Sequence, residues 1–244
     1  MKSFCRWSII ALMLLSAQIS AFSPAGPNSI YNNAYSSATR STQLEATSGS
    51  LGCRPIGVGS AAPKTVVTNV DLEQVVDTSD EWIQQRTGIA RRHLLLDGET
   101  LRDLSVTAAK NAMEMAGITA EEVDLVICAT SSPDDMFGDA PSVASALGCG
   151  KNTLAFDLTA ACSGFLFATV TAGKFLSGGN GFKNAIIIGA DALSRWVDWD
   201  DRNTCILFGD GAGAMVLTND DENPGVLGYA AHSNGGGYED LKLG

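Results

Sequence analysis

The stretch FDLTAACSGFLF, residues 156–167, joins the end of an apolar strand to a run of small residues and the beginning of a helix. The pattern predicts a strand over Leu154–Leu158 and a helix over Ser163–Leu176. Cys162 lies at the turn between them, where unpaired N–H groups and the positive end of the helix dipole favour a thiolate. Cys162 is therefore either a nucleophile for covalent catalysis or a small buried cysteine that fills the junction.

The rest of the body alternates strands and helices. Strands are predicted over Cys53–Gly59, Asp124–Thr130 and Ala185–Gly189, helices over 79–85, 101–116 and Pro141–Leu147, and two strand-like runs within Cys205–Leu217. Ser79 and Thr100 are the predicted N-caps of the first two helices. Leu101, Leu104, Ala108, Ala112 and Met115 form the apolar stripe of the second helix, which Gly117 ends. Strands that are apolar on both faces predict an α/β fold with a parallel-type sheet covered on both sides.

Composition and charge exclude several classes of protein. The chain has 244 residues, is 45% hydrophobic and has a formal net charge of −11, which argues against non-specific binding of nucleic acid. Its six cysteines and two histidines form neither a CxxC pair nor a spacing typical of zinc ligands, so no metal site is predicted. A chain this long and apolar has no need of a disulfide framework.

The first 50 residues have the composition of a targeting leader. Two basic residues precede an apolar run, Ile9–Leu15, and small residues follow at Ala17–Ala21. This pattern predicts a signal peptide over 1–21, with an N-terminal anchor helix as the alternative. Residues 22–50 are rich in Ser, Thr, Asn and Ala, and Phe22 lies at the expected cleavage site. Together they resemble the two-part leader of proteins bound for complex plastids, so we expect a plastid stromal protein without a membrane span after processing.

Four segments of the body resemble a single family. They are TSDEWIQQRTGI at 78–89, AACSG at 160–164, GAD at 189–191 and DRNTCILFGDGAGA at 201–214. In order and spacing they are similar to the β-ketoacyl-acyl-carrier-protein synthase III family, which begins fatty-acid synthesis. The resemblance runs from about residue 52 to residue 244.

The resemblance implies a thiolase-like fold, in which two similar βαβαβ halves stack into αβαβα layers, usually in a homodimer. We expect residues 51–220 to be the first half and 221–244 the start of a truncated second half. In this family a cysteine, at the position of Cys162, accepts the acetyl group of acetyl-CoA. Malonyl-acyl-carrier protein then loses CO₂, and its carbanion attacks the thioester to give acetoacetyl-acyl-carrier protein. No cofactor is implied.

The resemblance also implies roles for five binding residues. Trp82 and Arg202 would hold the adenine of CoA between them, and Thr78 and Arg86 would bind the nucleotide end. Phe137 would close the acyl pocket of the partner subunit. The alternatives are a core residue of a helix for Trp82, a surface ion pair for Arg202 and an ordinary core position for Phe137.

The sequence departs from the family at the residues that activate malonyl decarboxylation, a His and an Asn in a Gly-Asn-Thr-Ser type loop. Neither His93 nor His232 lies in a matching segment, so we expect the chain as written to be acylated but not to condense. Asn203 replaces a frequent Gly. The cluster 91–93, Arg-Arg-His, is interpreted as a solvated face rather than a carrier-protein dock, and Gly209–Gly213 as close packing at a strand bend rather than a dinucleotide loop.

Two other functions stay open. One is a different thiolase-fold condensing enzyme, which the DEWIQQRTG segment at 80–88 disfavours. The other is a non-catalytic fragment that dimerises with a complete synthase. Thioester formation at Cys162 would separate catalysis from mere interaction.

Overall fold

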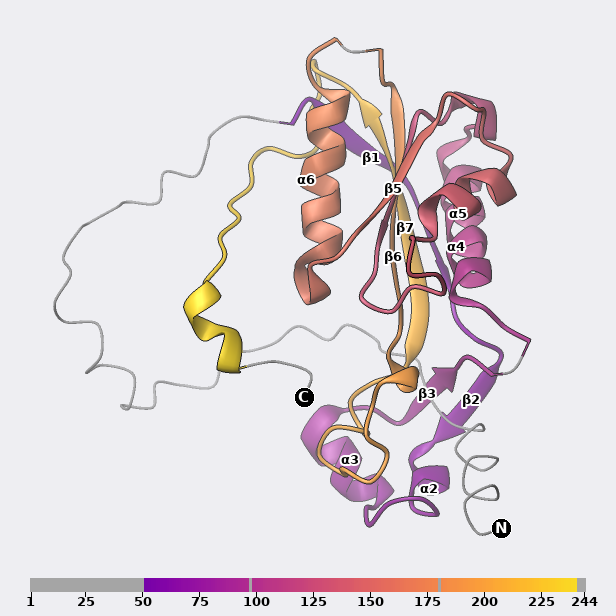
Figure 1. The fold of residues 1–244 in the computed structure, drawn as a ribbon, viewed down its shortest axis with the longest axis vertical. Coiled ribbons are helices and arrows are strands. Elements are labelled where there is room, and N and C mark those ends of the chain that lie inside the picture. Colours follow the sequence, from indigo (N-terminus) through magenta and orange to yellow (C-terminus); the bar gives the residue numbers. More distant parts are fainter. Residues whose placement is uncertain (1–50, 97, 180, 241–244) are drawn as a thin grey trace, which may run out of the picture.

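A computed structural model describes residues 51–96, 98–179 and 181–240. The predicted signal peptide, 1–21, and transit segment, 22–50, lie outside the described residues. The described chain forms a layered α/β body with a small subdomain at one end (Figure 1).

The body is built on a five-stranded sheet in the order β1-β7-β6-β4-β5. The strands are β1 Cys53–Ala61, β4 Leu125–Ala129, β5 Leu154–Leu158, β6 Asn184–Ala192 and β7 Asp210–Asn219. Strands β4, β5 and β6 are parallel, whereas β7 is antiparallel to β6 and to β1. The expectation of a parallel-type sheet was therefore wrong for β7, because a long connection through the subdomain returns the chain beside β6.

Helices cover both faces of the sheet, as the apolar strands predict. Helices α4 Leu101–Ala116 and α5 Ala140–Leu147 pack on one face, and α6 Gly164–Leu176 packs on the other. The strongly apolar β4 is buried along its whole length between these layers. Short 3-10 turns connect elements at η2 Ala120–Glu122, η3 Ala161–Ser163 and η4 Leu193–Arg195, and η5 Gly235–Asp240 is the last described element.

Helix α4 begins and ends where local chemistry predicts. The hydroxyl of Thr100 accepts a hydrogen bond from the N–H of Asp103 (3.0 Å), and Gly117 ends the helix in the left-handed region. The predicted stripe is buried except for Met115, which is 64% exposed; Met113 is buried instead. Met115 lies at the margin of the stripe, beside the edge strand β1, where its sulfur accepts the N–H of Val58.

The subdomain is a two-stranded hairpin with two short helices; the sequence patterns predicted the second helix, over 79–85, but neither the strands nor the first helix. Its elements are β2 Thr65–Thr68, α2 Asn69–Leu72, α3 Asp80–Thr87 and β3 Arg91–Leu94. The chain that follows β6, residues 193–208, folds over them and contributes Cys205 and Ile206 to a shared apolar core. The N-cap of α3 is Ser79, as predicted; its hydroxyl accepts the N–H of Trp82.

Arg92 corrects the interpretation of the cluster 91–93 as a solvated face. Its side chain is 1% exposed and donates to Asn69 Oδ1 at 2.7 Å and to the carbonyl of Ile206. Burial lowers the pKa of its guanidinium to about 10, which still leaves it charged at neutral pH. Arg92 therefore fastens the hairpin to the segment 193–208.

The segment Cys205–Leu217 also differs from expectation. Residues 205–207 form turns, and the glycines at 211 and 213 lie inside the regular strand β7, not at a bend. Asp210, at the beginning of β7, is fully buried and accepts hydrogen bonds from Leu95 N–H (2.8 Å) and from the backbone and hydroxyl of Ser194. The sheet and the subdomain are joined at this carboxylate.

Strand β1 approaches α4 so closely that only glycine fits at position 57. A Cβ there would lie 2.2 Å from the carbonyl oxygen of Ala112 and 2.7 Å from the nitrogen of Ala116. Gly57→Ala should therefore lower the free energy of unfolding by about 2–3 kcal/mol, because a helix backbone has to shift. Gly150→Ala is the control, since nothing lies within 4 Å of its Cβ position. Equal urea-denaturation midpoints for the two variants would contradict the close packing.

Candidate active site

The turn that carries Cys162 is strained and tightly packed. Ala161 has φ +44°, the one positive φ of a non-glycine among the described residues. Glycines bring the following helix close to the sheet, since a Cβ on Gly164 would lie 3.3 Å from that of Ala129 and one on Gly189 would lie 3.1 Å from the ring of Phe165. The turn thus projects Cys162 out of the body, and its side chain is exposed.

The N-terminus of α6 has no capping side chain. Ser163 occupies the N-cap in a helical conformation and its hydroxyl caps nothing. The N–H of Gly164 donates to the carbonyl of Ala161 in the preceding turn η3. What the helix offers to a thiolate at Cys162, or to an oxyanion formed beside it, is the positive end of its dipole. The predicted strand–turn–helix arrangement is confirmed, and the interpretation of Cys162 as a buried filler is wrong.

The other described cysteines differ from Cys162. Cys53, Cys128 and Cys205 are buried and Cys149 is half-buried. Burial raises the pKa of each of the four thiols, that of Cys205 to about 11, so they stay protonated and unreactive at neutral pH. Among the described cysteines, Cys162 alone is exposed.

Trp82 and Arg202 meet in the subdomain, although they are far apart in the chain. The guanidinium carbon of Arg202 lies 4.3 Å from the centre of the Trp82 ring, and that of Arg86 lies 4.6 Å from it. Arg202 also approaches the fully exposed carboxylate of Asp77 at 3.5 Å. The structure therefore brings together an aromatic face and two cations, which suit an anionic, planar ligand.

Two buried polar atoms at this place have no hydrogen-bond partner among the described residues: the hydroxyl of Thr78 and Nε of Arg202. An unpaired buried donor costs about 1–3 kcal/mol unless a ligand or water satisfies it. Both belong to residues that the sequence resemblance assigned to nucleotide binding. Asn203, the departure from the family pattern, is exposed beside them, and its N–H donates to Asp201 Oδ1.

The turn that carries Cys162 and the cluster of Trp82, Arg86 and Arg202 lie at the same edge of the sheet. Cys162 follows the carboxyl end of β5, whereas β6 runs at its carboxyl end into η4 and the segment that carries Arg202 (Figure 1). Only β4 separates the two parallel strands, so they are about 10 Å apart. In α/β sheets, ligands bind in the crevice outside the carboxyl ends of the strands.

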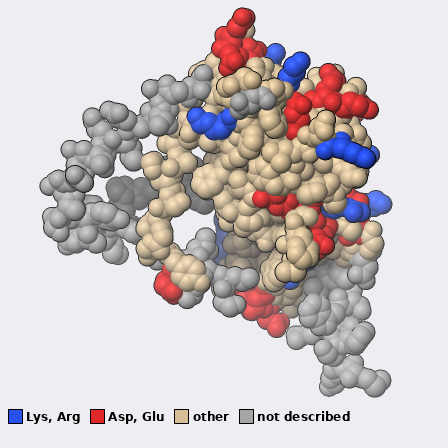
Figure 2. Space-filling view, turned by 45° about the horizontal axis from the view of Figure 1, so that its top comes forward, with Lys and Arg blue, Asp and Glu red and all other residues tan. Residues whose placement is uncertain are grey.

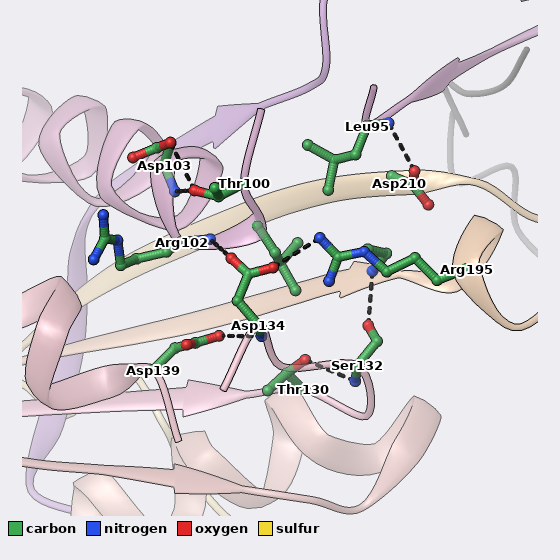
Figure 3. Close-up of polar contacts among 12 residues, drawn as sticks. Leu95, Thr100, Arg102, Asp103, Thr130, Ser132, Asp134, Asp139, Arg195 and Asp210 are labelled. Atoms are coloured by element: carbon green, nitrogen blue, oxygen red, sulfur yellow. Dashed lines mark hydrogen bonds and ion pairs between the residues drawn. The ribbon is translucent and has the colours of Figure 1, made fainter. Parts of the chain in front are cut away.

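Phe137 lies at the tip of the loop between β4 and α5. It is 89% exposed and its neighbour Met136 is 88% exposed, so the interpretation of Phe137 as an ordinary core residue is wrong. The loop is held by polar contacts, and Figure 3 shows Asp134 accepting from the backbone of Arg102 (2.9 Å) and from the guanidinium of Arg195 (2.7 Å). A hollow of about 590 Å³ lies along the loop and the start of α5.

Comparison with known proteins identifies the family. The family model of 3-oxoacyl-[acyl-carrier-protein (ACP)] synthase III matches residues 156–235. 3-Oxoacyl and β-ketoacyl are two names for the same group. The chain is 52% identical over 194 residues to the chloroplastic synthase III B of Cuphea wrightii, across 79% of this chain and 48% of that protein. It is 54% identical over 185 residues to the synthase III of Prochlorococcus marinus, across 76% and 54%.

A solved structure agrees with these sequences. The crystal structure of 3-oxoacyl-[acyl-carrier-protein] synthase III from Aquifex aeolicus superposes with a TM-score of 0.66 at 47% identity, across 70% of this chain and 55% of that one. The chain belongs to the β-ketoacyl-acyl-carrier-protein synthase III family. The thiolase-like fold expected from the resemblance is thereby confirmed. The chain spans about half the length of the curated relatives that it matches.

The surface of the chain agrees with the charge analysis. On the face drawn in Figure 2, Lys and Arg are scattered among Asp and Glu and form no continuous basic patch. Within the described ranges no helix is both long enough and apolar enough to cross a membrane. The same ranges contain no cluster of three His, Cys, Asp or Glu side chains that could hold a metal ion.

The two histidines lie in unrelated places. His93 contacts the carbonyl of Pro63 through Nδ1 at 2.5 Å, within the subdomain. His232 is exposed and lines a hollow of about 400 Å³ between the outer face of α6 and the segment 226–232. The outer face of α6 is apolar, with Leu166 66% exposed.

Sequence reasoning missed several residues of this region. Asp77, which approaches Arg202, and Asp157, which lies on β5, carry no motif of their own. Positive φ at Ala161 could not be foreseen either, because alanine has no preference for that region. The small residues before Cys162 were the available signal, since a tight turn needs them.

Proposed function

We propose that this chain carries the acyl-accepting and CoA-binding half of a β-ketoacyl-acyl-carrier-protein synthase III, which condenses acetyl-CoA with malonyl-acyl-carrier protein and so begins fatty-acid synthesis. One observation supports this most: an exposed cysteine at an uncapped helix N-terminus shares a sheet edge with a stacked Trp–Arg pair. The names of its relatives in plants and cyanobacteria agree with the proposal.

The first half-reaction would use the groups that lie at this edge of the sheet. The thiolate of Cys162 attacks the thioester carbonyl of acetyl-CoA, and the positive end of the α6 dipole stabilises the oxyanion. The C–S bond to CoA then breaks, CoA leaves as a thiolate and the acetyl group stays on Cys162. Trp82 and Arg202 hold the adenine, while Thr78 and Arg86 contact the nucleotide end.

In the second half-reaction malonyl-acyl-carrier protein loses CO₂, and the resulting carbanion attacks the acetyl thioester and releases the Cys162 thiolate. The His and Asn that would stabilise this step are assigned to no residue of the chain. Phe137 reaches into the acyl pocket of a partner subunit in a homodimer. The enzyme needs no cofactor or metal, and it works in a plastid, since the relatives from Cuphea wrightii and Arabidopsis thaliana are chloroplastic.

Acetyl transfer tests the proposal directly. The protein is mixed with acetyl-CoA, quenched in acid and measured by intact mass, and the modified peptide is mapped. One acetyl group on the peptide that contains Cys162 supports the function, whereas an unchanged mass contradicts it. Addition of malonyl-acyl-carrier protein then shows whether this chain also condenses, through the appearance of acetoacetyl-acyl-carrier protein.

A further inference from the structure

Asp157 joins two parts of the proposed site that are separate in the chain. It lies on β5, the strand that leads into the Cys162 turn. Its neighbours Phe156 and Leu158 pack toward α6. Because side chains alternate along a strand, Asp157 points to the other face, toward α5 and the loop that carries Phe137.

Both carboxylate oxygens of Asp157 accept backbone hydrogen bonds from the beginning of α5. Oδ2 accepts from the N–H of Asp139 at 2.9 Å, and Oδ1 accepts from the N–H of Ala140 at 2.7 Å. The side chain of Asp139, although it occupies the N-cap, makes no capping bond. Asp157 thus caps α5 from a different element.

The contact is also tight against the residue next to Phe137. Gly138 has φ +95°, and a Cβ built on it would lie 3.0 Å from the carboxylate carbon of Asp157. Any side chain at position 138 would therefore displace Asp157 or the loop. The contact between Gly138 and Asp157 therefore holds the loop against β5 next to Phe137.

The other end of the loop is fixed as well. The side chain of Asp139, which is 6% exposed, accepts the N–H of Asp134 at 2.7 Å, and Asp134 in turn binds Arg102 and Arg195 (Figure 3). Loop 134–139 is therefore clamped at both ends while its tip stays exposed.

We propose that Asp157 is a positioning residue, which holds loop 134–139 in a fixed place on its own subunit and so sets how Phe137 closes the acyl pocket of the partner subunit. The proposal rests on the acyl transfer proposed above, in which Phe137 closes an acyl pocket. Asparagine at this position keeps the size but has one acceptor oxygen, so one of the two N–H groups loses its partner. Loop 134–139 then moves more freely, and the acyl pocket that Phe137 closes accepts longer acyl chains.

The selectivity of acylation tests this role. We expect Asp157→Asn to raise the ratio of the acylation rate with hexanoyl-CoA to that with acetyl-CoA by about fivefold to tenfold, the effect of one lost hydrogen bond. A merely structural effect lowers the folded fraction and so changes both rates by the same factor. Rates are measured by intact mass after acid quench.

Asp124→Asn is the matched control. Asp124 also accepts two backbone hydrogen bonds, from Lys183 at 2.7 Å and Asn184 at 3.1 Å, but it precedes β4 at the opposite end of the sheet. Both of these bonds go to Oδ2, which the amide oxygen of asparagine can replace. Asp124→Asn therefore controls for the loss of a carboxylate charge, and it should keep the rate ratio of the unmodified protein. An unchanged ratio in Asp157→Asn, or the same change in both variants, overturns the proposal.

Hydrogen–deuterium exchange provides a readout that does not need acyl transfer. Asp157→Asn should speed exchange in residues 134–140, whereas Asp124→Asn should leave this segment unchanged. Unchanged exchange in 134–140 of Asp157→Asn would mean that Asp157 does not hold the loop. If the unmodified protein accepts no acyl group, the proposed function fails, and the exchange pattern still decides the positioning role.

Discussion

Cys162→Ala should abolish acetyl transfer from acetyl-CoA, with a fall in rate on the order of 10⁵-fold, as for other catalytic nucleophiles. No other described thiol can take over, because burial keeps the remaining four protonated. Acid-quenched intact mass measures the rate. Cys149→Ala, at a half-buried thiol, is the control and should be acylated like the unmodified protein.

Alkylation gives a second measurement of the same thiol. Limited iodoacetamide at neutral pH should modify Cys162 before any other described cysteine, with peptide mapping to separate them. Prior acetylation should protect it. The nucleophile assignment is wrong if Cys162→Ala is still acetylated at the normal rate, or if acetyl-CoA leaves alkylation of Cys162 unchanged.

Arg202→Ala should raise the dissociation constant for CoA by about 10- to 100-fold, the range expected for loss of a stacked, partly desolvated arginine. The guanidinium stacks over Trp82 and its buried Nε has no partner among the described residues, so the variant loses both a stacking face and a donor. Isothermal titration with CoA measures the constant, and Trp82→Ala should weaken binding to a similar degree.

Arg54→Ala is a suitable control, since Arg54, on β1, forms an exposed ion pair with Asp220, which follows β7. It removes the same charge and should leave CoA affinity unchanged. Arg202 lies far from the reacting carbon, so its loss should raise KM for acetyl-CoA more than it lowers the rate at saturation. Equal affinities of Arg54→Ala and Arg202→Ala would place the CoA site elsewhere.

Local signals were sufficient for most of the elements of the body. Thr100 and Gly117 mark the ends of α4 because a side-chain acceptor and a left-handed glycine act within one turn of the chain. The buried run of β4 and the small-residue helix α6 were likewise predicted from their own residues. The hairpin β2–β3 was missed, because its four-residue strands pair across two helices without a turn signal between them.

Contacts between distant segments explain the errors. Arg92 is charged and was therefore expected at the surface. Inside the subdomain core, however, its guanidinium donates hydrogen bonds to Asn69 and to the carbonyl of Ile206. The glycines of β7 suggest a bend, but pairing with β1 and β6 on either side keeps the strand regular. In both cases the residues that make these contacts lie far away in the sequence, so a short stretch around Arg92 or around the glycines does not contain them.

The sequence by itself determined the turn that carries Cys162, because a strand, small residues and a helix that follow one another place this cysteine at a helix N-terminus. It also carried the motifs by which the family is recognised. Only the tertiary structure decided that Arg202 stacks on Trp82, that Phe137 is exposed, and that Asp157 clamps its loop. These contacts join residues separated along the chain, so their geometry depends on how the sheet brings its carboxyl ends together.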